Sequence, residues 1–213
     1  MPQRTPQDRE EQSMKAIGII GSGNMGNRYK RILEMLGVDV VMFDEHDWQD
    51  APRYKKDLHS IIVASPTEFH FENLMILDDF KVLCEKPISK DIDQVRKVCD
   101  KIKCLRMVNQ YEHLAPSEGR GLEDSHYNYF KTGSDGLEWD CINIIGLAKN
   151  PPHIFNDSPI WKCKINGHEL NLGDMDLAYV RMIKEWVKQP ASNKRYMIQA
   201  HERILEGAYK CAK

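Results

Sequence analysis

Two short motifs carry residue types that can do chemistry. The first is a glycine-rich run in which Gly21, Gly23 and Gly26 occupy the first, third and sixth positions. Glycines at this spacing let a turn of backbone approach a phosphate group closely. The second is Glu85-Lys86-Pro87, which places an amine beside a carboxylate. A lysine ammonium can polarise a reacting oxygen, and partial burial can bring its pKa toward neutral pH.

The segments around the glycine run predict a strand, a helix and a second strand. Apolar residues lead into the run over 15–20, recur at helical spacing until Gly37, and continue as a valine-rich strand over 38–43. A lone glycine run is often only a flexible loop, but this βαβ context is typical of dinucleotide binding. We therefore expect the helix N-terminus to hold a pyrophosphate. The cofactor-binding residues predicted in this loop are Gly21, Gly23, Asn24, Met25 and Gly26.

An acidic residue follows the second predicted strand. Asp44 stands about 20 residues beyond the loop, the usual spacing of a side chain that accepts hydrogen bonds from ribose hydroxyls. A 2′-phosphate in that turn would meet Asp44, Glu45 and Asp47, and the turn contains no arginine to receive it. The sequence thus favours NAD as the cofactor, with NADP as the weaker alternative.

The alternation of strands and helices continues to residue 110. It predicts a doubly wound parallel sheet over 14–110, preceded by a disordered tail over 1–13. The second and third strands are so close that a helix between them must be very short or absent. We expect a further helix to begin at Ser89 as its N-cap. The other predicted elements are strands at 61–64, 81–84 and 104–108 and a helix at 67–79.

The pattern changes beyond residue 110. Segments 127–131 and 161–172 predict antiparallel strands, with Asn166-Gly167 as a hairpin turn in the second. Two amphipathic helices close the chain. We predict an α/β fold whose Rossmann domain is followed by a smaller, reduced α+β substrate domain over 111–193. A closing helix over 194–213 should pack back on the nucleotide domain.

Composition excludes several classes of function. A formal net charge of −2 gives no basic footprint for nucleic acid, and no apolar run is long enough to cross a membrane. The 6 cysteines form no Cys-x-x-Cys pair and the 8 histidines lack metal-ligand spacing. We expect reduced thiols, a cytoplasmic protein without a metal site, and a small-molecule substrate. A homo-oligomer is compatible with this sequence.

The motifs together resemble the Gfo/Idh/MocA oxidoreductases, the glucose–fructose oxidoreductase and inositol dehydrogenase group. The resemblance rests on the glycine loop, the Glu-Lys-Pro motif, and a turn at residues 65–67 followed by His70. It extends more weakly to the closing helices. It implies that Lys86 is a catalytic residue that positions nicotinamide, and that the bond before Pro87 is cis. The cofactor-adjacent residues that it implies are Ser65, Pro66, Thr67, His70, Glu85 and Lys86.

His70 is expected to stay neutral because helix N-terminal placement lowers the pKa of an imidazole. We predict a structural or cofactor-adjacent role for it. Glu85 is expected to orient Lys86. The alternative for Lys86 is a solvated surface lysine before a loop proline.

The chain also departs from the family pattern. Many members carry His-x-x-Asp in the substrate domain, whereas the nearest segment here places Asp140 and Asn143 at those positions. We expect both residues, together with Tyr111, to face the catalytic cleft. The alternative for Asp140 and Asn143 is a helix end with solvated polar side chains. The predicted substrate domain is also shorter than in the family.

These observations favour an NAD-dependent oxidoreductase that transfers hydride between nicotinamide and a small sugar, polyol or related carbonyl compound. One alternative is a dinucleotide-binding sensor that lacks turnover, which the short substrate domain and the missing histidine favour. Another is an imine reductase, because a protonated C=N bond has less need of a dedicated acid.

Overall fold

The structure is a computed structural model. It describes residues 15–113, 127–130, 154–155, 162–165, 168–170, 172–188 and 192–205. The predicted tail over 1–13 lies outside the described residues.

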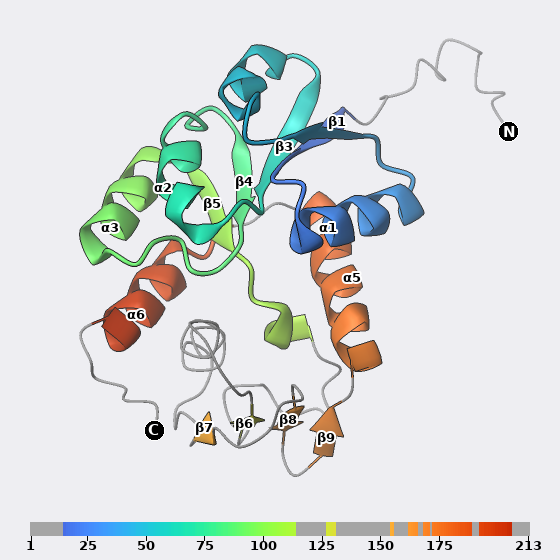
Figure 1. The fold of residues 1–213 in the computed structure, drawn as a ribbon, viewed down its shortest axis with the longest axis vertical. Coiled ribbons are helices and arrows are strands. Elements are labelled where there is room, and N and C mark those ends of the chain that lie inside the picture. The colour runs from blue at the N-terminus through green and yellow to red at the C-terminus, as the bar shows by residue number, and fades with distance from the viewer. Residues whose placement is uncertain are drawn as a thin grey trace, which may run out of the picture.

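A five-stranded sheet forms the centre of the molecule (Figure 1). Its strand order is β2-β1-β3-β4-β5, and every neighbouring pair is parallel. The predicted parallel sheet is therefore confirmed. The order reverses at β1, because β2 lies on one side of it and β3 on the other; ligands of such sheets bind where the order reverses. The strands are β1 (Ala16–Ile20), β2 (Val40–Phe43), β3 (Leu58–Val63), β4 (Lys81–Cys84) and β5 (Cys104–Met107).

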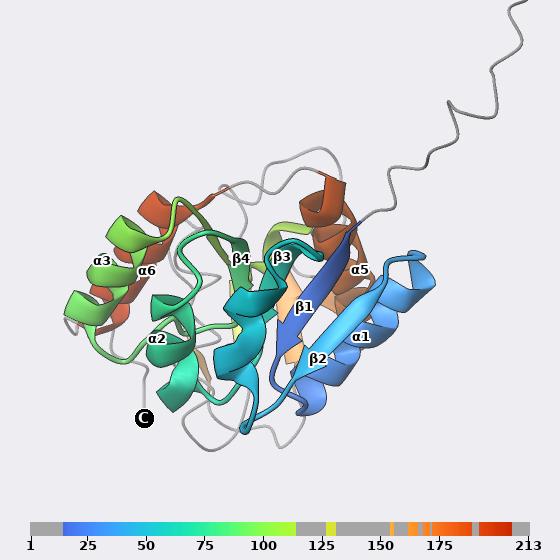
Figure 2. The ribbon, with the colours of Figure 1, turned by 90° about the horizontal axis from the view of Figure 1, so that it is seen from above.

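Helices cover both faces of this sheet. Figure 2 shows α1 (Asn24–Met35) and α5 (Leu172–Lys188) on one side, and α2 (Thr67–Met75), α3 (Ile92–Lys101) and α6 (Lys194–Leu205) on the other. Since successive strand residues point to opposite faces, Ile19 belongs to the core under α1 and α5, whereas Ile20 belongs to the core under the other helices. The doubly wound arrangement is thus confirmed.

The two closing helices both pack on the five-stranded parallel sheet. Trp186 of α5 is fully buried in the core that α5 shares with α1. Met197 of α6 is fully buried in the opposite core, and the Asn193 side chain bonds to both the N–H and the carbonyl of Met107 in β5. Helix α5 falls within the range predicted as substrate domain, yet in the structure its apolar face covers the Rossmann sheet.

Helix α1 ends as Gly37 predicts. Gly37 has φ +72, and its N–H donates to the Glu34 carbonyl while the Val38 N–H donates to that of Leu33. This pair of bonds is a Schellman motif. Because Val38 serves in the cap, β2 begins at Val40, and the predicted start of the strand at residue 38 is wrong.

Two other helix boundaries also differ from the predictions. Helix α3 is capped by Asp91, whose side chain accepts from the Asp93 N–H. The predicted N-cap, Ser89, is therefore wrong. The Ser89 hydroxyl instead accepts from the Asp91 N–H. Helix α2 ends at Met75 rather than at residue 79, because the chain turns there with bonds from Leu77 and Phe80 to carbonyls three residues back. The short connection between β2 and β3 contains only the 3-10 helix η2 (Trp48–Tyr54), as its length predicted.

A second, four-stranded sheet has the order β7-β6-β8-β9. The pairs β6–β8 and β8–β9 are antiparallel, which confirms the strand types predicted for 127–131 and 161–172. Strand β7 was not predicted and pairs parallel to β6. The strands are β6 (Tyr127–Phe130), β7 (Ile154–Phe155), β8 (Lys162–Ile165) and β9 (His168–Leu170).

Candidate functional site

Two of the three glycines in the loop after β1 are required by the fold. Gly21 has φ +108, and a Cβ there would lie 2.6 Å from the backbone of Ala64 and Ser65. A Cβ on Gly26 would lie 1.8 Å from the Gly21 carbonyl oxygen. Any side chain at either position would therefore push apart the loop, β3 and the first turn of α1.

Gly23 differs from both. Among the described residues, no heavy atom beyond its chain neighbours lies within 4 Å of a Cβ built on it, and its φ is an ordinary −73. It is the N-cap of α1, and no described side chain caps that helix end. The Asn27 amide holds the loop by donating to the carbonyls of Ser22 and Gly23, at 2.6 and 3.1 Å. The protein fold does not need glycine at position 23, whereas a ligand that lies on the loop would.

A pocket of about 600 Å³ lies over this loop, at the carboxyl ends of β1, β2 and β3. This is the place where the strand order reverses, as expected for a ligand site in such a sheet. The predicted cofactor residues that line it are Gly21, Gly23, Asn24, Met25, Asp44, Ser65 and Pro66. The predicted cofactor residues that are not among its lining residues are Gly26, Thr67, His70, Glu85 and Lys86.

Trp48, Phe69 and Asn73 are among the pocket-lining side chains that sequence reasoning missed. Phe69 is 47% exposed, so its ring is available to a ligand in the pocket. Asn73 is buried and accepts a hydrogen bond from the Ser65 hydroxyl at 2.6 Å. The sequence shows an aromatic residue between Thr67 and His70, but it does not show that this residue is exposed.

The turn after β2 is acidic and tightly bonded. Asp44 accepts from the His46 N–H at 2.8 Å, and the Asp44 N–H donates to the Asp47 carboxylate at 2.6 Å. Asp44, Glu45 and His46 line the pocket, and none of its described lining residues is a lysine or an arginine. The electrostatics of this end of the pocket therefore disfavour a further phosphate.

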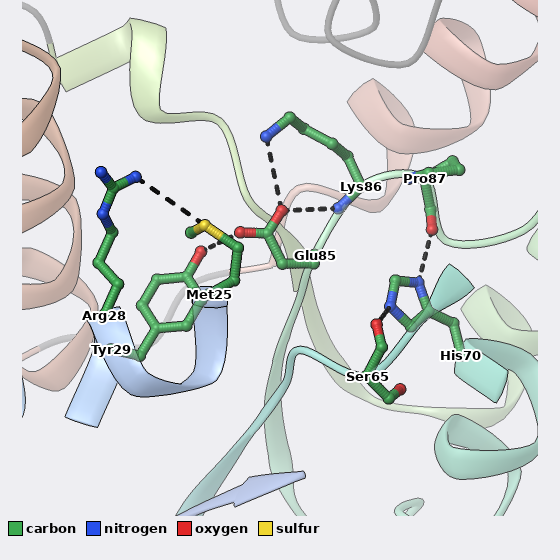
Figure 3. A network of polar contacts seen from close by, with 8 residues as sticks. All are labelled: Met25, Arg28, Tyr29, Ser65, His70, Glu85, Lys86 and Pro87. Carbon is green, nitrogen blue, oxygen red and sulfur yellow. Dashed lines mark hydrogen bonds and ion pairs between the residues drawn. The ribbon is translucent and has the colours of Figure 1, made fainter. Parts of the chain in front are cut away.

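His70 joins two turns from inside the protein. It is 1% exposed, with Nδ1 2.7 Å from the Pro87 carbonyl oxygen and Nε2 2.8 Å from that of Ser65 (Figure 3). A neutral imidazole has one N–H and can satisfy only one carbonyl, whereas an imidazolium would satisfy both. Burial lowers the pKa of His70, and the two carbonyls oppose that shift. The expected direction is therefore found, with burial rather than the helix terminus as its main cause.

The lysine motif follows β4 at the same edge of the sheet as the glycine loop. The Lys86–Pro87 bond is cis, as the resemblance implied. Glu85 is nearly buried; its Oε2 accepts from the Lys86 N–H at 3.1 Å and lies 3.5 Å from Lys86 Nζ. The Lys86 side chain is 9% exposed, so the alternative of a solvated surface lysine does not describe it. Oε1 of Glu85 accepts from the hydroxyl of Tyr29, a residue that sequence reasoning placed only in the apolar stripe of the helix.

Helix α6 reaches the same turn through His201. This buried imidazole accepts from the Ile88 N–H at 3.1 Å through Nε2, and its Nδ1 donates to the Met197 carbonyl at 2.7 Å. Both contacts are satisfied by one neutral tautomer. Burial lowers the pKa of His201 to about 4.

This contact predicts a loss of stability in acid. Below the ordinary value of 6.5, the unfolded chain binds a proton at position 201 that the folded protein does not bind, so the free energy of unfolding falls until the folded pKa near 4 is reached. The total loss should be roughly 3 kcal/mol between those two pH values. Urea unfolding at several pH values would measure it, with His201→Gln as a non-titrating control. An equally steep acid decline in that variant would contradict the assignment to His201.

Three predicted site residues remain to be placed, namely Tyr111, Asp140 and Asn143. Tyr111 belongs to the 3-10 helix η3 (Gln110–His113), which follows β5 and is held to α5 by a bond from Arg181 to the His113 carbonyl. Asp140 and Asn143 lie outside the described residues. Within the described ranges, no group of three or more potential metal ligands occurs, and no helix is long and apolar enough to cross a membrane.

Comparisons with known proteins agree with this fold. No protein-family model matches the chain, and no curated protein sequence matches it. A Gfo/Idh/MocA family oxidoreductase from Vibrio cholerae superposes with a TM-score of 0.68 at 10% identity, over 92% of this chain and 96% of that one. The WlbA (WbpB) dehydrogenase from Thermus thermophilus, solved with NAD and UDP-GlcNAcA, gives 0.64 at 11% identity, over 94% and 96%.

A third similar structure is scyllo-inositol dehydrogenase from Lactobacillus casei with bound NAD(H) and scyllo-inositol. It gives a TM-score of 0.56 at 13% identity, over 89% of this chain and 94% of that one. At identities this low the superpositions establish the fold alone, and the activity must be argued from the site. In fold, the chain matches the Gfo/Idh/MocA oxidoreductases, as its glycine loop and Glu-Lys-Pro motif had indicated.

Proposed function

We propose that this protein is an NAD-dependent oxidoreductase that transfers hydride between nicotinamide and a small sugar, polyol or related carbonyl compound. The observation that carries the proposal is Gly23, the one of the three loop glycines at which the fold leaves room for a Cβ, room that a pyrophosphate on the loop would need. The similar dehydrogenases from T. thermophilus and L. casei hold NAD, which supports the same cofactor here.

The pocket residues have separable tasks in this proposal. The uncapped N-terminus of α1 attracts the pyrophosphate, because its N–H groups and dipole present partial positive charge. Asp44 accepts hydrogen bonds from the adenosine ribose, and Trp48 and Phe69 offer apolar surface to the adenine ring. Bound NAD would supply the hydride acceptor or donor. Lys86 donates a hydrogen bond to the substrate oxygen and stabilises the charge that develops there.

A sensor without turnover is the second candidate, and one observation favours it. The pocket covers the loop and the adenosine end, while Lys86 is not among its lining residues and is held against Glu85. A protein that only binds the dinucleotide would need the pocket and would not need Lys86. The decisive experiment is analysis of metabolites that co-purify with the protein, followed by NADH absorbance over a panel of sugars and polyols. Turnover of any panel member supports the oxidoreductase, whereas tight NADH binding without turnover supports the sensor.

The acidic turn predicts the cofactor preference. NADH should bind more tightly than NADPH, because a 2′-phosphate would meet Asp44 and Glu45 in a pocket whose described lining residues include no lysine or arginine. Asp44→Ala should weaken NADH, improve NADPH and so narrow the gap between them. Calorimetric titration of both cofactors measures this, with Asp57→Ala, an exposed carboxylate outside the pocket lining, as the control. Tighter binding of NADPH to the parent protein would contradict the ribose argument.

A further inference from the structure

Tyr29 is a buried tyrosine whose hydroxyl reaches a carboxylate. It lies on α1, one turn after Gly26, and is 0% exposed. Its ring meets the ring of Tyr179 from α5 edge to face, at 6.0 Å between centroids. The hydroxyl leaves this apolar environment and donates to Glu85 Oε1. A buried hydroxyl placed in this way is fixed in direction by its packing and by its acceptor.

Glu85 divides its two oxygens between Tyr29 and Lys86. Oε1 receives the Tyr29 hydroxyl, while Oε2 receives the Lys86 N–H and faces Lys86 Nζ at 3.5 Å (Figure 3). The side chains of Glu85 and Lys86 are each 9% exposed, so little water is available to replace a lost partner. Tyr29 therefore helps to orient the carboxylate, and the carboxylate helps to place the amine.

This chain of contacts is suited to holding groups in place rather than to moving protons. Burial and the Glu85 carboxylate raise the pKa of Tyr29 well above 10, so the phenol stays protonated and acts as a donor. Its complete burial also gives a proton no exit to solvent on that side.

We propose that Tyr29 is a positioning residue for Lys86 and acts through Glu85. The proposal rests on the proposed function, in which Lys86 contacts the substrate oxygen. It also gives α1 a second task. The glycine loop lies at the N-terminus of this helix, and Tyr29, on the next turn, orients the carboxylate that contacts Lys86. One rigid helix therefore positions both the loop and the amine.

The test measures the reactivity of Lys86 and needs no substrate. Tyr29→Phe removes only the hydroxyl, and Tyr179→Phe removes a hydroxyl from the other ring of the aromatic pair as the matched control. The cofactor-free protein is labelled with trace acetic anhydride across a pH range. Modification of Lys86 is read by peptide mass spectrometry relative to the exposed Lys56.

In Tyr29→Phe we expect Lys86 to react roughly tenfold faster, because the Glu85 carboxylate loses a donor that fixes its orientation and then holds the amine less firmly. Tyr179→Phe should leave the Lys86 profile at the parental one. Glu85→Gln, in which Tyr29 is intact, should show a similar rise even if Tyr29→Phe does not fold. Adding Tyr29→Phe to Glu85→Gln should produce no further change, since the two changes act on one path.

A parental Lys86 profile in Tyr29→Phe, with only a lower melting temperature, would overturn the proposal and leave Tyr29 a packing residue. Additive effects in the double variant would overturn the path through Glu85. The labelling result is independent of turnover. A positive result without any oxidised or reduced substrate would therefore keep the positioning role and reject the oxidoreductase.

Discussion

Gly23→Val should abolish measurable NADH binding and lower the melting temperature only slightly, because Gly23 is the N-cap of α1 and valine is a poorer N-cap residue than glycine. A Cβ at this position meets no described atom within 4 Å, so the fold accepts it, and the branched side chain fills the space over the loop where a pyrophosphate would lie. Loss of the close backbone approach and of the phosphate contacts should weaken binding at least about a hundredfold. Calorimetry gives the affinity and a thermal scan gives the stability.

Gly26→Ala is the matched contrast. Its Cβ would lie 1.8 Å from the Gly21 carbonyl oxygen, so this smaller change should lower the melting temperature by displacing the loop. The pair separates a glycine that a ligand needs from one that the fold needs. Unchanged NADH affinity in a folded Gly23→Val protein would show that the dinucleotide does not lie on this loop.

The glycine loop could be predicted from sequence because its glycine spacing and the apolar runs that flank it are local signals. Gly26 is required by the nearby Gly21 carbonyl, whereas the contact of Gly21 with Ala64 and Ser65 appears only in the structure. Gly37, whose positive φ ends α1, is likewise a local signal. The cap of α3 was not predicted correctly: Ser89 was expected, whereas in the structure the Asp91 side chain accepts from the Asp93 N–H.

The contacts behind the lysine could not be predicted in this way. The Tyr29–Glu85 bond joins residues 56 positions apart, and in sequence Tyr29 is only an apolar-stripe residue of a helix. His201 of α6 reaches Ile88 across 113 positions. Such pairs arise when the sheet brings distant segments to one edge, and they cannot be predicted from the periodicity of a single segment.

The position of Lys86 makes its contribution to chemistry directly testable. In Lys86→Ala, Glu85 keeps the Tyr29 hydroxyl and the backbone N–H of residue 86, so the buried carboxylate is not stripped of its donors. The pocket over the glycine loop is likewise untouched, since Lys86 does not line it. NADH affinity should therefore remain near the parental value, whereas turnover of a substrate found in the panel should fall by roughly a hundredfold or more.

Lys86→Arg should not restore that turnover. A guanidinium does not deprotonate near neutral pH, and its planar fork presents donors in a geometry unlike that of an ammonium. It is also larger than the amine, in a place where the side chain is 9% exposed and already faces Glu85 at 3.5 Å. Steady-state kinetics with NADH held saturating would measure both variants, with Lys56→Ala as the exposed-lysine control. Parental turnover in Lys86→Ala would show that the lysine does not contact the reacting oxygen, and the buried Glu85–Lys86 pair would then be a structural feature of the turn.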